Sequence, residues 1–539
     1  MKSSSTTDIV DALVGKGVLT EEEGKLITKG HSAKTSATPV VKEKDGAFKL
    51  ESANGRNSIQ LTGRVHFDAR SIDGKGGVDN TTNNPDRDSA SLGDNFELRR
   101  ARIGVKGTIA KNYDYEILTN LLGGSSNLVD VAFINAGLIN NEKSKPLQFR
   151  AGIFKQPFNL EEYGTSSNNI DFMERSYVNQ LTPAKKGGFM LHGALENGMT
   201  YAGSVYQQNT FGETDNETTG KGFAGRGSMN LSQLFGSKET VFHIGVSGFD
   251  SEYGVIPTSS SNGSTIAAAT CTSTSTSTAV ASSGGTPTIT TTTTCPAVAA
   301  SIGTNGTVFG LRSEGRGLSN IYRAQIGGDS VNQGGSMPSN RAAKIDNKAY
   351  GLELAAAYGP FKVQGEYTSQ DFKARHDVGS SVDAEVNAGY VEALWLVTGE
   401  NYADWYKNGA WGGIKPKKDF DADTLQGLGA WEVGFRYDAF EAKDVSVVSG
   451  GASSSSRVGG SLAAPTGCSS SNNQCTGGNL SGGAETYTAG IKWQLNSNMR
   501  VLANYSRTKF DYAFSPIDLS NATKINKEDI LMVRTQFNF

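Results

Sequence analysis

The feature that most constrains the fold of this chain is an alternation of apolar and polar residues that begins near residue 58 and recurs up to the final Phe539. Between residues 59 and 70, positions 59, 61, 65 and 67 are apolar, and the positions between them are mostly polar or charged. The segments 101–109, 431–439, 487–495 and 531–539 repeat this pattern. Since successive side chains of a strand point to opposite faces, a period of two predicts β-strands with one apolar and one polar face.

The polarity of these strands is reversed relative to a soluble sheet. About ten residues per crossing, an apolar outer face, terminal aromatic residues and charges on the inner face are typical of a transmembrane β-barrel. The sequence has no run of 18 apolar residues that would form a membrane-crossing helix. Only 19% of the residues are charged, against ~25% in soluble domains. Basic residues (51) and acidic residues (54) nearly balance without a charged block, so no nucleic-acid partner is expected.

Turn lengths predict the topology. Sixteen strands fit between residues 58 and 539, and tight turns such as 110–112, 358–360 and 496–498 alternate with longer connections. Outer-membrane barrels have short periplasmic turns and long extracellular loops, so both termini are placed in the periplasm. The predicted fold is therefore all-β: a sixteen-stranded antiparallel transmembrane β-barrel at 46–539 with a short N-terminal helical hairpin. Residues 252–347 and 441–484 become long extracellular loops, and 399–427 becomes an unusually long periplasmic connection.

The first 45 residues follow a different pattern. Residues 1–29 predict a periplasmic helical hairpin, with Thr20 and Glu23 spaced as a capping box, and residues 30–45 predict a polar linker. The hairpin is interpreted as an appendage that assists assembly or binds peptidoglycan or another envelope component. The alternative is a poorly ordered tail.

Four cysteines lie in Ser/Thr/Gly-rich stretches of the predicted extracellular loops. Cys271 with Cys295, and Cys468 with Cys475, predict two local disulfides, because thiols oxidise outside the cell; free thiols are the alternative. No charged residue occurs from Tyr253 to Leu311. This tract is either unstructured filler or a loop that carries glycans or faces particles.

Five segments in order carry a resemblance to a known family. They are FELRRARIGVKGTI (96–109), FRAGIFKQPFNLEEYGTSSNNIDFMER (149–175), YGLELAAAYGPFKVQGEY (350–367), LVTGE with GAWEVGFRYDAF (396–400, 429–440) and GIKWQLNSNMRVLANYSR (490–507). Together they resemble the phosphate-selective porin O/P family, and the match runs from about residue 46 to 539. The resemblance implies a homotrimeric, water-filled channel in the outer membrane of a Gram-negative bacterium, surrounded by lipid and lipopolysaccharide and permeated by small anions.

The resemblance also implies that the third extracellular loop folds inward and narrows the pore. In this chain that constriction loop is 155–186, and a surface loop folded outward is the alternative. The charged residues assigned to it are Glu161, Glu162, Asp171, Glu174, Arg175, Lys185 and Lys186.

Basic residues on the polar face are candidates for an anion pathway. Arg suits phosphate because its planar fork pairs with two oxygens and keeps its charge. The candidates are Arg64, Arg70, Arg99, Arg100, Arg102, Lys106, Arg150, Lys155, Lys362, Arg436, Lys492 and Arg534. Within this set, 99–102 forms an RRAR run that matches the family's motif. The alternative is a wall of salt bridges, since the same face carries Asp68, Asp114, Glu116, Glu353, Glu366, Glu432 and Asp438.

This mixed charge predicts a general or mildly anion-selective porin with phosphate among its permeants, rather than a dedicated phosphate channel. The alternatives are a surface adhesin or receptor barrel and a cell-envelope tethering protein. No catalytic motif, haem site or metal-ligand spacing is present, so no enzyme activity, cofactor or metal is expected.

Overall fold

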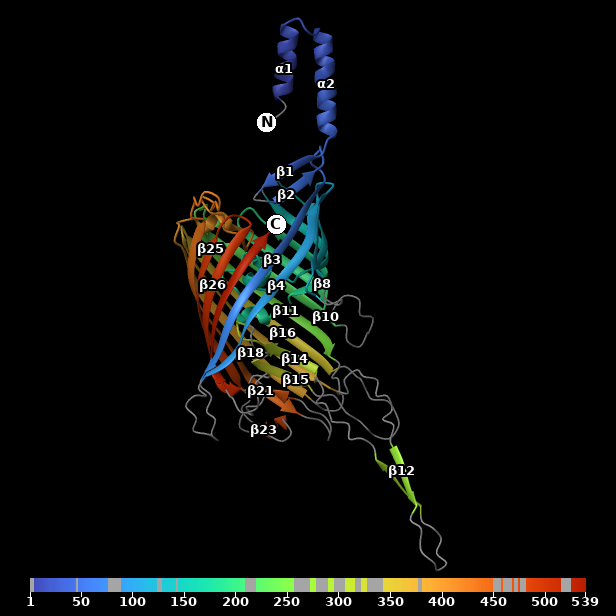
Figure 1. Cartoon of the computed structure of the whole chain (residues 1–539), viewed down its shortest axis with the longest axis vertical. Coiled ribbons are helices and arrows are strands. Elements are labelled where there is room, and N and C mark those ends of the chain that lie inside the picture. The colour runs from blue at the N-terminus through green and yellow to red at the C-terminus, as the bar shows by residue number, and fades with distance from the viewer. Residues whose placement is uncertain are drawn as a thin grey trace, which may run out of the picture.

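The computed structural model describes residues 4–44, 47–75, 89–123, 128–141, 144–208, 220–255, 272–277, 289–294, 306–315, 321–326, 343–376, 381–448, 457–458, 468–469, 474–475, 481–514 and 525–539. Sixteen long antiparallel strands in these residues form a closed barrel (Figure 1). They are β3 (Ser58–Lys75), β4 (Ser89–Ile109), β5 (Tyr113–Asn120), β6 (Val129–Ile139), β7 (Lys145–Lys155), β8 (Lys185–Ala194), β9 (Met199–Gln207), β10 (Lys221–Asn230), β11 (Thr240–Val255), β16 (Ala343–Tyr358), β17 (Phe361–Arg375), β18 (Ser381–Leu396), β21 (Ala430–Val448), β25 (Gly482–Gln494), β26 (Met499–Phe514) and β27 (Ile525–Asn538).

Closure comes from the pairing of the last strand with the first. β27 pairs with β3 from Lys527 opposite Lys75 to Asn538 opposite Arg64, and every other barrel strand pairs with its two neighbours along the chain. Closing the sheet leaves no open edge, which is what a strand protein requires in lipid. The predicted sixteen-stranded fold is confirmed.

The barrel wall has the reversed polarity expected from the sequence. Along β16 every second residue is buried, and the exposed positions include Leu352 and Leu354. The buried positions include Glu353, whose side chain points into the lumen, where it pairs with Arg226. Lipid therefore covers the apolar face, and the interior holds the charges.

The two ends of the barrel differ. Figure 1 shows both termini at one end and the long excursions at the other. At the terminal end, Gly359 turns the chain from β16 to β17 with a φ of 53°, a left-handed conformation that suits glycine. At the opposite end, the predicted excursion 252–347 is shorter at both ends, because β11 extends to Val255 and β16 begins at Ala343. It includes the hairpin of β12 (Thr272–Ser277) and β13 (Ile289–Thr294). β14 (Gly306–Leu311) pairs with β15 (Tyr322–Ile326) rather than with a barrel strand, in agreement with the prediction that it belongs to a loop.

The N-terminal region contains more structure than predicted. Helices α1 (Ser4–Gly15) and α2 (Glu21–Ala37) form a hairpin that stands clear of the barrel (Figure 1). The backbone N–H of Thr20 donates to the Glu23 carboxylate at 2.8 Å, and that of Glu23 donates to Thr20 Oγ1 at 3.2 Å, which is the predicted capping box. None of the described helices is long and apolar enough to cross a membrane.

The predicted polar linker 30–45 is wrong. Helix α2 continues to Ala37, and β1 (Val40–Lys44) follows and pairs with β2 (Ala47–Glu51). β2 then pairs with β3, with Leu50 opposite Ile59. The physical reason is that β27 leaves the first residues of β3 without a partner on one side, so AFKLE can pair with them and VVKEK can pair with AFKLE.

Three segments fold into the barrel, whereas the sequence predicted one. The first, 156–184, contains the π-helix η3 (Asn159–Gly164) and the short helix α3 (Tyr177–Gln180). The second is the β14–β15 hairpin, which packs on α3 and on the inner faces of β16, β17, β18 and β21. The third, called the periplasmic segment here after the side predicted for it, lies within 399–427 and contains the 3-10 helix η4 (Tyr402–Trp405), β19 (Tyr406–Lys407) and β20 (Ala410–Trp411). The predicted extracellular loop 441–484 is shorter at both ends in the structure, because β21 extends to Val448 and β25 begins at Gly482.

Candidate functional site

The segment 156–184, called the constriction loop here, lies against the inner wall of the barrel. Its side chains Leu160, Met173 and Tyr177 are completely buried, and Phe172 is nearly so. Apolar packing inside a charged lumen explains why the loop folds inward: these rings and aliphatic groups leave water by doing so. The loop is shorter than the predicted 155–186. At its N-terminal end Lys155 still belongs to β7, and at its C-terminal end Lys185 and Lys186 already belong to β8.

Carboxylates of the wall hold the backbone of the constriction loop. Glu366 of β17 accepts hydrogen bonds from the N–H groups of Leu160 and Glu161 at 2.7 and 2.8 Å, at the start of η3. Asp438 of β21 accepts one from the N–H of Tyr177 at 2.8 Å. Backbone N–H groups at the start of a helical turn lack partners within it, so a carboxylate at this position stabilises the turn.

Basic residues of the wall neutralise the acids of the constriction loop. Glu174 pairs with Arg99, Arg534 and Arg70 at 2.8, 3.0 and 3.1 Å. Asp171 pairs in the same way with Lys362 at 2.6 Å and Lys492 at 3.4 Å. These acids are therefore engaged with basic residues of the wall.

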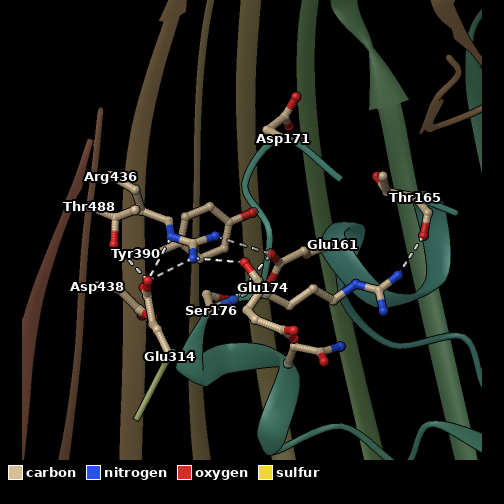
Figure 2. Close-up of polar contacts among 12 residues, drawn as sticks. Glu161, Thr165, Asp171, Glu174, Ser176, Glu314, Tyr390, Arg436, Asp438 and Thr488 are labelled. Atoms are coloured by element: carbon tan, nitrogen blue, oxygen red, sulfur yellow. Dashed lines mark hydrogen bonds and ion pairs between the residues drawn. The ribbon is translucent and has the colours of Figure 1, made fainter. Parts of the chain in front are cut away.

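Arg436 joins two inward-folded segments. Figure 2 shows its guanidinium group between Glu161 of the constriction loop and Glu314, which follows β14. The distances are 3.6 Å to the Glu161 carboxylate and 3.0 Å to that of Glu314, and Arg436 also donates to the Glu174 carbonyl oxygen at 2.9 Å. Thr488 donates to Glu314 at 2.7 Å. One buried cation thus fixes both segments to β21.

The loop carboxylates titrate differently because their surroundings differ. Burial raises the pKa of Glu161, despite nearby Arg436 and Arg175 and the hydrogen bonds from Ser176. Burial also acts on Glu162, but Arg175 at 3.0 Å and Lys155 outweigh it and lower its pKa to about 2. Glu162 therefore stays ionised in any physiological medium.

A bulge explains how consecutive arginines of the RRAR run both reach the interior. Arg100 lies opposite His66, and Leu98 lies opposite Phe67, so Arg99 is an extra residue in β4. The bulge turns Arg99 inward to Glu174, whereas strict alternation would have turned it to lipid. Arg100 approaches His66 Nδ1 at 3.4 Å and is nearly buried.

The structure divides the predicted basic residues into two groups. One group is covered by the inward-folded segments and does not line the open passage, contrary to the prediction, because the loop acids bind it. This covered group consists of Arg70, Lys362, Arg436, Lys492 and Arg534. Arg100 is buried beside His66, whereas Arg99, which pairs with Glu174, keeps 18% of its side chain exposed. The second group lies on the wall from β3 to β8, which the loop leaves accessible. It consists of Arg64, Arg102, Arg150, Lys155, Lys185 and Lys186, all half-buried.

Several residues of this accessible wall make no ion pair with any described carboxylate. Arg64 donates to Ser167 of the constriction loop. Arg150 lies 4.3 Å from the centre of the Phe133 ring and donates to Asn135, and Lys186 donates to the Gln208 carbonyl oxygen. By contrast, Arg102 pairs with Asp130 at 3.0 Å, and Lys185 pairs with the same carboxylate.

Lys106 has a different position from the other candidates. It is exposed at the periplasmic mouth, where it lines a cavity of about 670 Å³ together with Lys42, Lys49 and Glu51 of the β1–β2 hairpin. The charged side chains that line this mouth are three lysines and Glu51, and Glu51 pairs with Lys42 at 2.8 Å and Lys49 at 3.3 Å.

Sequence reasoning missed a buried group that anchors the periplasmic segment. Arg226 forms a two-point pair with Glu353 at 2.8 and 2.6 Å and donates to the Gly409 carbonyl oxygen at 3.1 Å. His243 lies between Glu353, at 3.0 Å, and the Tyr406 hydroxyl, at 2.6 Å. The sequence did contain a signal for this inward-folded segment. Residues 399–427 are long and contain tryptophans, although short turns are the rule on the side of the barrel predicted for them.

Two of the four cysteines lie within the described residues. In the ladder of β23 (Cys468–Ser469) and β24 (Gln474–Cys475), Cys468 is directly opposite Cys475. Cys271 and Cys295 lie outside the described residues, but their sequence neighbours Thr272 and Thr294 are paired in the β12–β13 ladder. Among the described residues, no group of three or more His, Cys, Asp or Glu side chains is placed to hold a metal ion.

Comparison with known proteins gives one family. A family model described as phosphate-selective porin O and P matches residues 59–295 and 304–539. Porin O of Pseudomonas aeruginosa is 24% identical over 494 residues, which cover 88% of this chain and 89% of that protein.

Solved structures of outer-membrane proteins also align with the chain. Outer-membrane expressed OmpT of Vibrio cholerae aligns with a TM-score of 0.43 at 8% identity, covering 93% of this chain and 100% of that one. The anion-selective porin from Comamonas acidovorans aligns with a TM-score of 0.40 at 10% identity, covering 90% and 100%.

Proposed function

We propose that the channel of this protein prefers small anions, phosphate among them. The premise is that the chain belongs to the phosphate-selective porin O and P family and is a porin of the Gram-negative outer membrane. The observation that carries the proposal is that the acidic side chains of the constriction loop are paired, whereas some basic side chains of the lumen are not. Glu161, Asp171 and Glu174 of the constriction loop pair with basic residues of the wall, and Glu162 pairs with Arg175 and Lys155. By contrast, Arg64, Arg150 and Lys186 of the accessible wall have no described carboxylate partner. A permeating anion then meets a net positive surface at the narrow zone.

The selectivity follows from elementary electrostatics. An ion that leaves bulk water needs compensating dipoles or counter-charges in the pore lining. Arginine forks supply both to an oxyanion, and they keep their charge at any working pH. The pairs of Asp130 with Arg102 and Lys185 reduce the net charge of the same wall, which supports a mild preference rather than strict exclusion of cations.

Reversal potentials in planar bilayers under asymmetric KCl test this proposal. The wild-type channel should prefer chloride, and Arg64→Ala or Arg150→Ala should lower the anion-to-cation permeability ratio about fivefold, since a unit charge ~4 Å away in water is worth about 1 kcal/mol. The matched control is Arg375→Ala, which removes an exposed arginine paired with Asp383 on the outer face. A cation-selective wild type, or an equal effect of the control, would refute the proposal.

The barrel shape supports a homotrimer. Strands β5 to β10 have 8–11 residues, whereas the others have 13–21, so one side of the barrel is low. Its outer face is rich in large apolar groups, including Phe149 and Phe189, whose stacked rings lie 6.0 Å apart. Three low walls that meet at a central axis would shield one another. Native mass measurement should give a trimer, and Leu191→Trp on this wall should weaken it more than Val363→Trp on the opposite wall.

We also propose that the loops contain two disulfide bonds. The register of β23 and β24 supports a bond between Cys468 and Cys475, and that of β12 and β13 supports one between Cys271 and Cys295. Peptide mapping without reductant should recover both linked pairs. Four thiols that react with maleimide in the untreated protein would contradict the assignment.

The helical hairpin is proposed to bind an envelope component such as peptidoglycan. Figure 1 shows it projecting away from the barrel, and Ile9, Val18 and Leu26 leave apolar surface exposed on it. Exposed apolar surface on a small appendage supports a partner outside the barrel.

A further inference from the structure

We propose that a groove on the lipid-facing surface of the barrel, over β17, β18, β21 and β25, binds an acyl chain of lipopolysaccharide. The groove has a volume of about 520 Å³. It lies on the outer wall and plays no part in the anion pathway. The inference rests on the placement of the barrel in the outer membrane but not on the selectivity of its pore.

The groove arises from one row of residues across four neighbouring strands. Tyr367 lies opposite Gly389, which lies opposite Ala439, which lies opposite Glu485. Two small residues side by side leave a depression between Tyr367 on one side and Glu485 on the other. Gly389 faces outward because its neighbour Tyr390 points into the lumen, where it donates to Glu366 at 2.6 Å.

The surroundings of the groove place it at the boundary between hydrocarbon and headgroups. Toward the terminal end of the barrel, the outer wall presents aliphatic side chains such as Val391 and Ile491, both about half exposed. At the level of the groove it presents Tyr367, Tyr437 and Tyr487, and tyrosine is typical of the membrane interface. A ligand of this groove therefore has an apolar chain directed toward the hydrocarbon and a polar head directed toward the extracellular side.

The rim carries charges that suit a phosphorylated sugar headgroup. Lys509 is exposed, lies opposite Glu485 in the ladder and sits 5.6 Å from the centre of the Tyr487 ring. Its ammonium group can bind a phosphate directly. Glu441, Glu485 and Asp511 line the same rim and would engage phosphates through divalent cations. Lipopolysaccharide combines acyl chains, phosphates and bridging divalent cations on the extracellular side.

A second copy of this chain is a poorer occupant. In the order of strands around the ring, β17, β18, β21 and β25 lie opposite β5 to β8, which belong to the low wall assigned to the trimer contact. The charged rim also disfavours an apolar protein contact, because desolvating Lys509 and three carboxylates would cost free energy.

Substitution of the groove floor tests the proposal. Ala439→Trp fills the depression from outside, and Ala489→Trp is the matched control, because Ala489 is an exposed outward alanine on β25 beyond the groove. Full-length protein extracted from outer membranes in mild detergent is analysed for bound lipopolysaccharide by native mass spectrometry. Delipidated protein is then titrated with purified lipopolysaccharide, with and without EDTA.

The expected result is a loss of lipopolysaccharide affinity in Ala439→Trp of roughly tenfold, the effect of about two lost methylene contacts. Ala489→Trp should bind like the wild type, and EDTA should weaken the binding of both. Equal binding by Ala439→Trp and wild type, or equal loss in both variants, would overturn the proposal. So would equally tight binding of phosphatidylglycerol in competition.

The same preparations separate this inference from the proposed function. All three proteins should conduct equally in bilayers, because the groove lies outside the lumen. If the wild type binds lipopolysaccharide but prefers cations, the anion preference is contradicted and the lipopolysaccharide site is still supported. If the wild type prefers anions but its lipopolysaccharide binding does not depend on the groove, the lipopolysaccharide site is contradicted and the anion preference is still supported.

Discussion

At the scale of single residues, the arrangement inside the barrel depends on carboxylates that could not be paired from the sequence. The alternation correctly indicated that Asp68, Glu366 and Asp438 face inward, because a period of two assigns faces along each strand. It did not indicate which arginine meets which acid, because the partners are far apart in sequence. The inward turn of Arg99 needs the β4 bulge, which no local pattern in the RRAR run reveals.

The first prediction concerns Glu174, on which Arg70, Arg99 and Arg534 converge. Glu174→Gln leaves three buried guanidinium groups with less counter-charge, so we expect a loss of about 3–5 kcal/mol in the free energy of unfolding. Urea unfolding in lipid vesicles measures it. The control is Glu97→Gln, which removes a half-exposed carboxylate 3.3 Å from Arg70 and should cost under about 1 kcal/mol. Similar losses in both variants would contradict the assigned role.

The second prediction concerns pH. The pKa of Glu162 is lowered from 4.5 to about 2, so its ion pairs stabilise the folded loop fully above pH 4.5 and lose this contribution as the pH falls toward 2. At 1.36 kcal/mol per unit the shift is worth roughly 3 kcal/mol. Glu162→Gln should therefore unfold more easily than the wild type at pH 6, and the difference should vanish near pH 2. A difference that persists at pH 2 would show that shape, not charge, matters at this position.

At the scale of elements, strands were predictable, but the inward-folded segments were only partly so. Strand bounds follow from local alternation, and all sixteen strands appear near their predicted positions. The inward path of the constriction loop came from a family resemblance. The β14–β15 hairpin and the periplasmic segment were missed, because their apolar side chains are buried against distant strands and follow no fixed period of their own.

The third prediction tests the anchor of the periplasmic segment. Arg226→Gln removes the two-point pair with Glu353 and the hydrogen bond to Gly409, so η4, β19 and β20 should leave the lumen more often. We expect a higher single-channel conductance and a loss of about 3–5 kcal/mol in the free energy of unfolding. Arg375→Gln, which breaks an exposed pair with Asp383, serves as the control and should change neither. Destabilisation without any change of conductance would show that the segment does not limit the passage.

At the scale of the whole molecule, the position of the charged side chains matters more than the net charge of the chain. The chain has a net charge of −3, yet its accessible inner wall is mainly basic, because most loop acids are bound to the covered wall. The sequence therefore showed a lining of mixed charge, whereas the distribution of charges in three dimensions supports the proposed mild preference for anions. The molecule thus has three distinct surfaces, which are the charged lumen, the apolar outer wall and the projecting hairpin, for which we propose an envelope partner.

The last prediction concerns that hairpin, which the geometry separates from the channel. Gly24 lies where a Cβ atom would come within 2.7 Å of Val14 and 3.3 Å of Val10, so Gly24→Leu should force α1 and α2 apart. Both Gly24→Leu and a deletion of residues 1–38 should reduce sedimentation of the porin with isolated cell walls, while single-channel conductance and barrel unfolding stay unchanged. Lys25→Leu is the control, because it adds the same side chain at an exposed position beside Gly24. Undiminished sedimentation of both hairpin variants would remove the envelope-binding role, and a fall in conductance would show that the hairpin belongs to the channel.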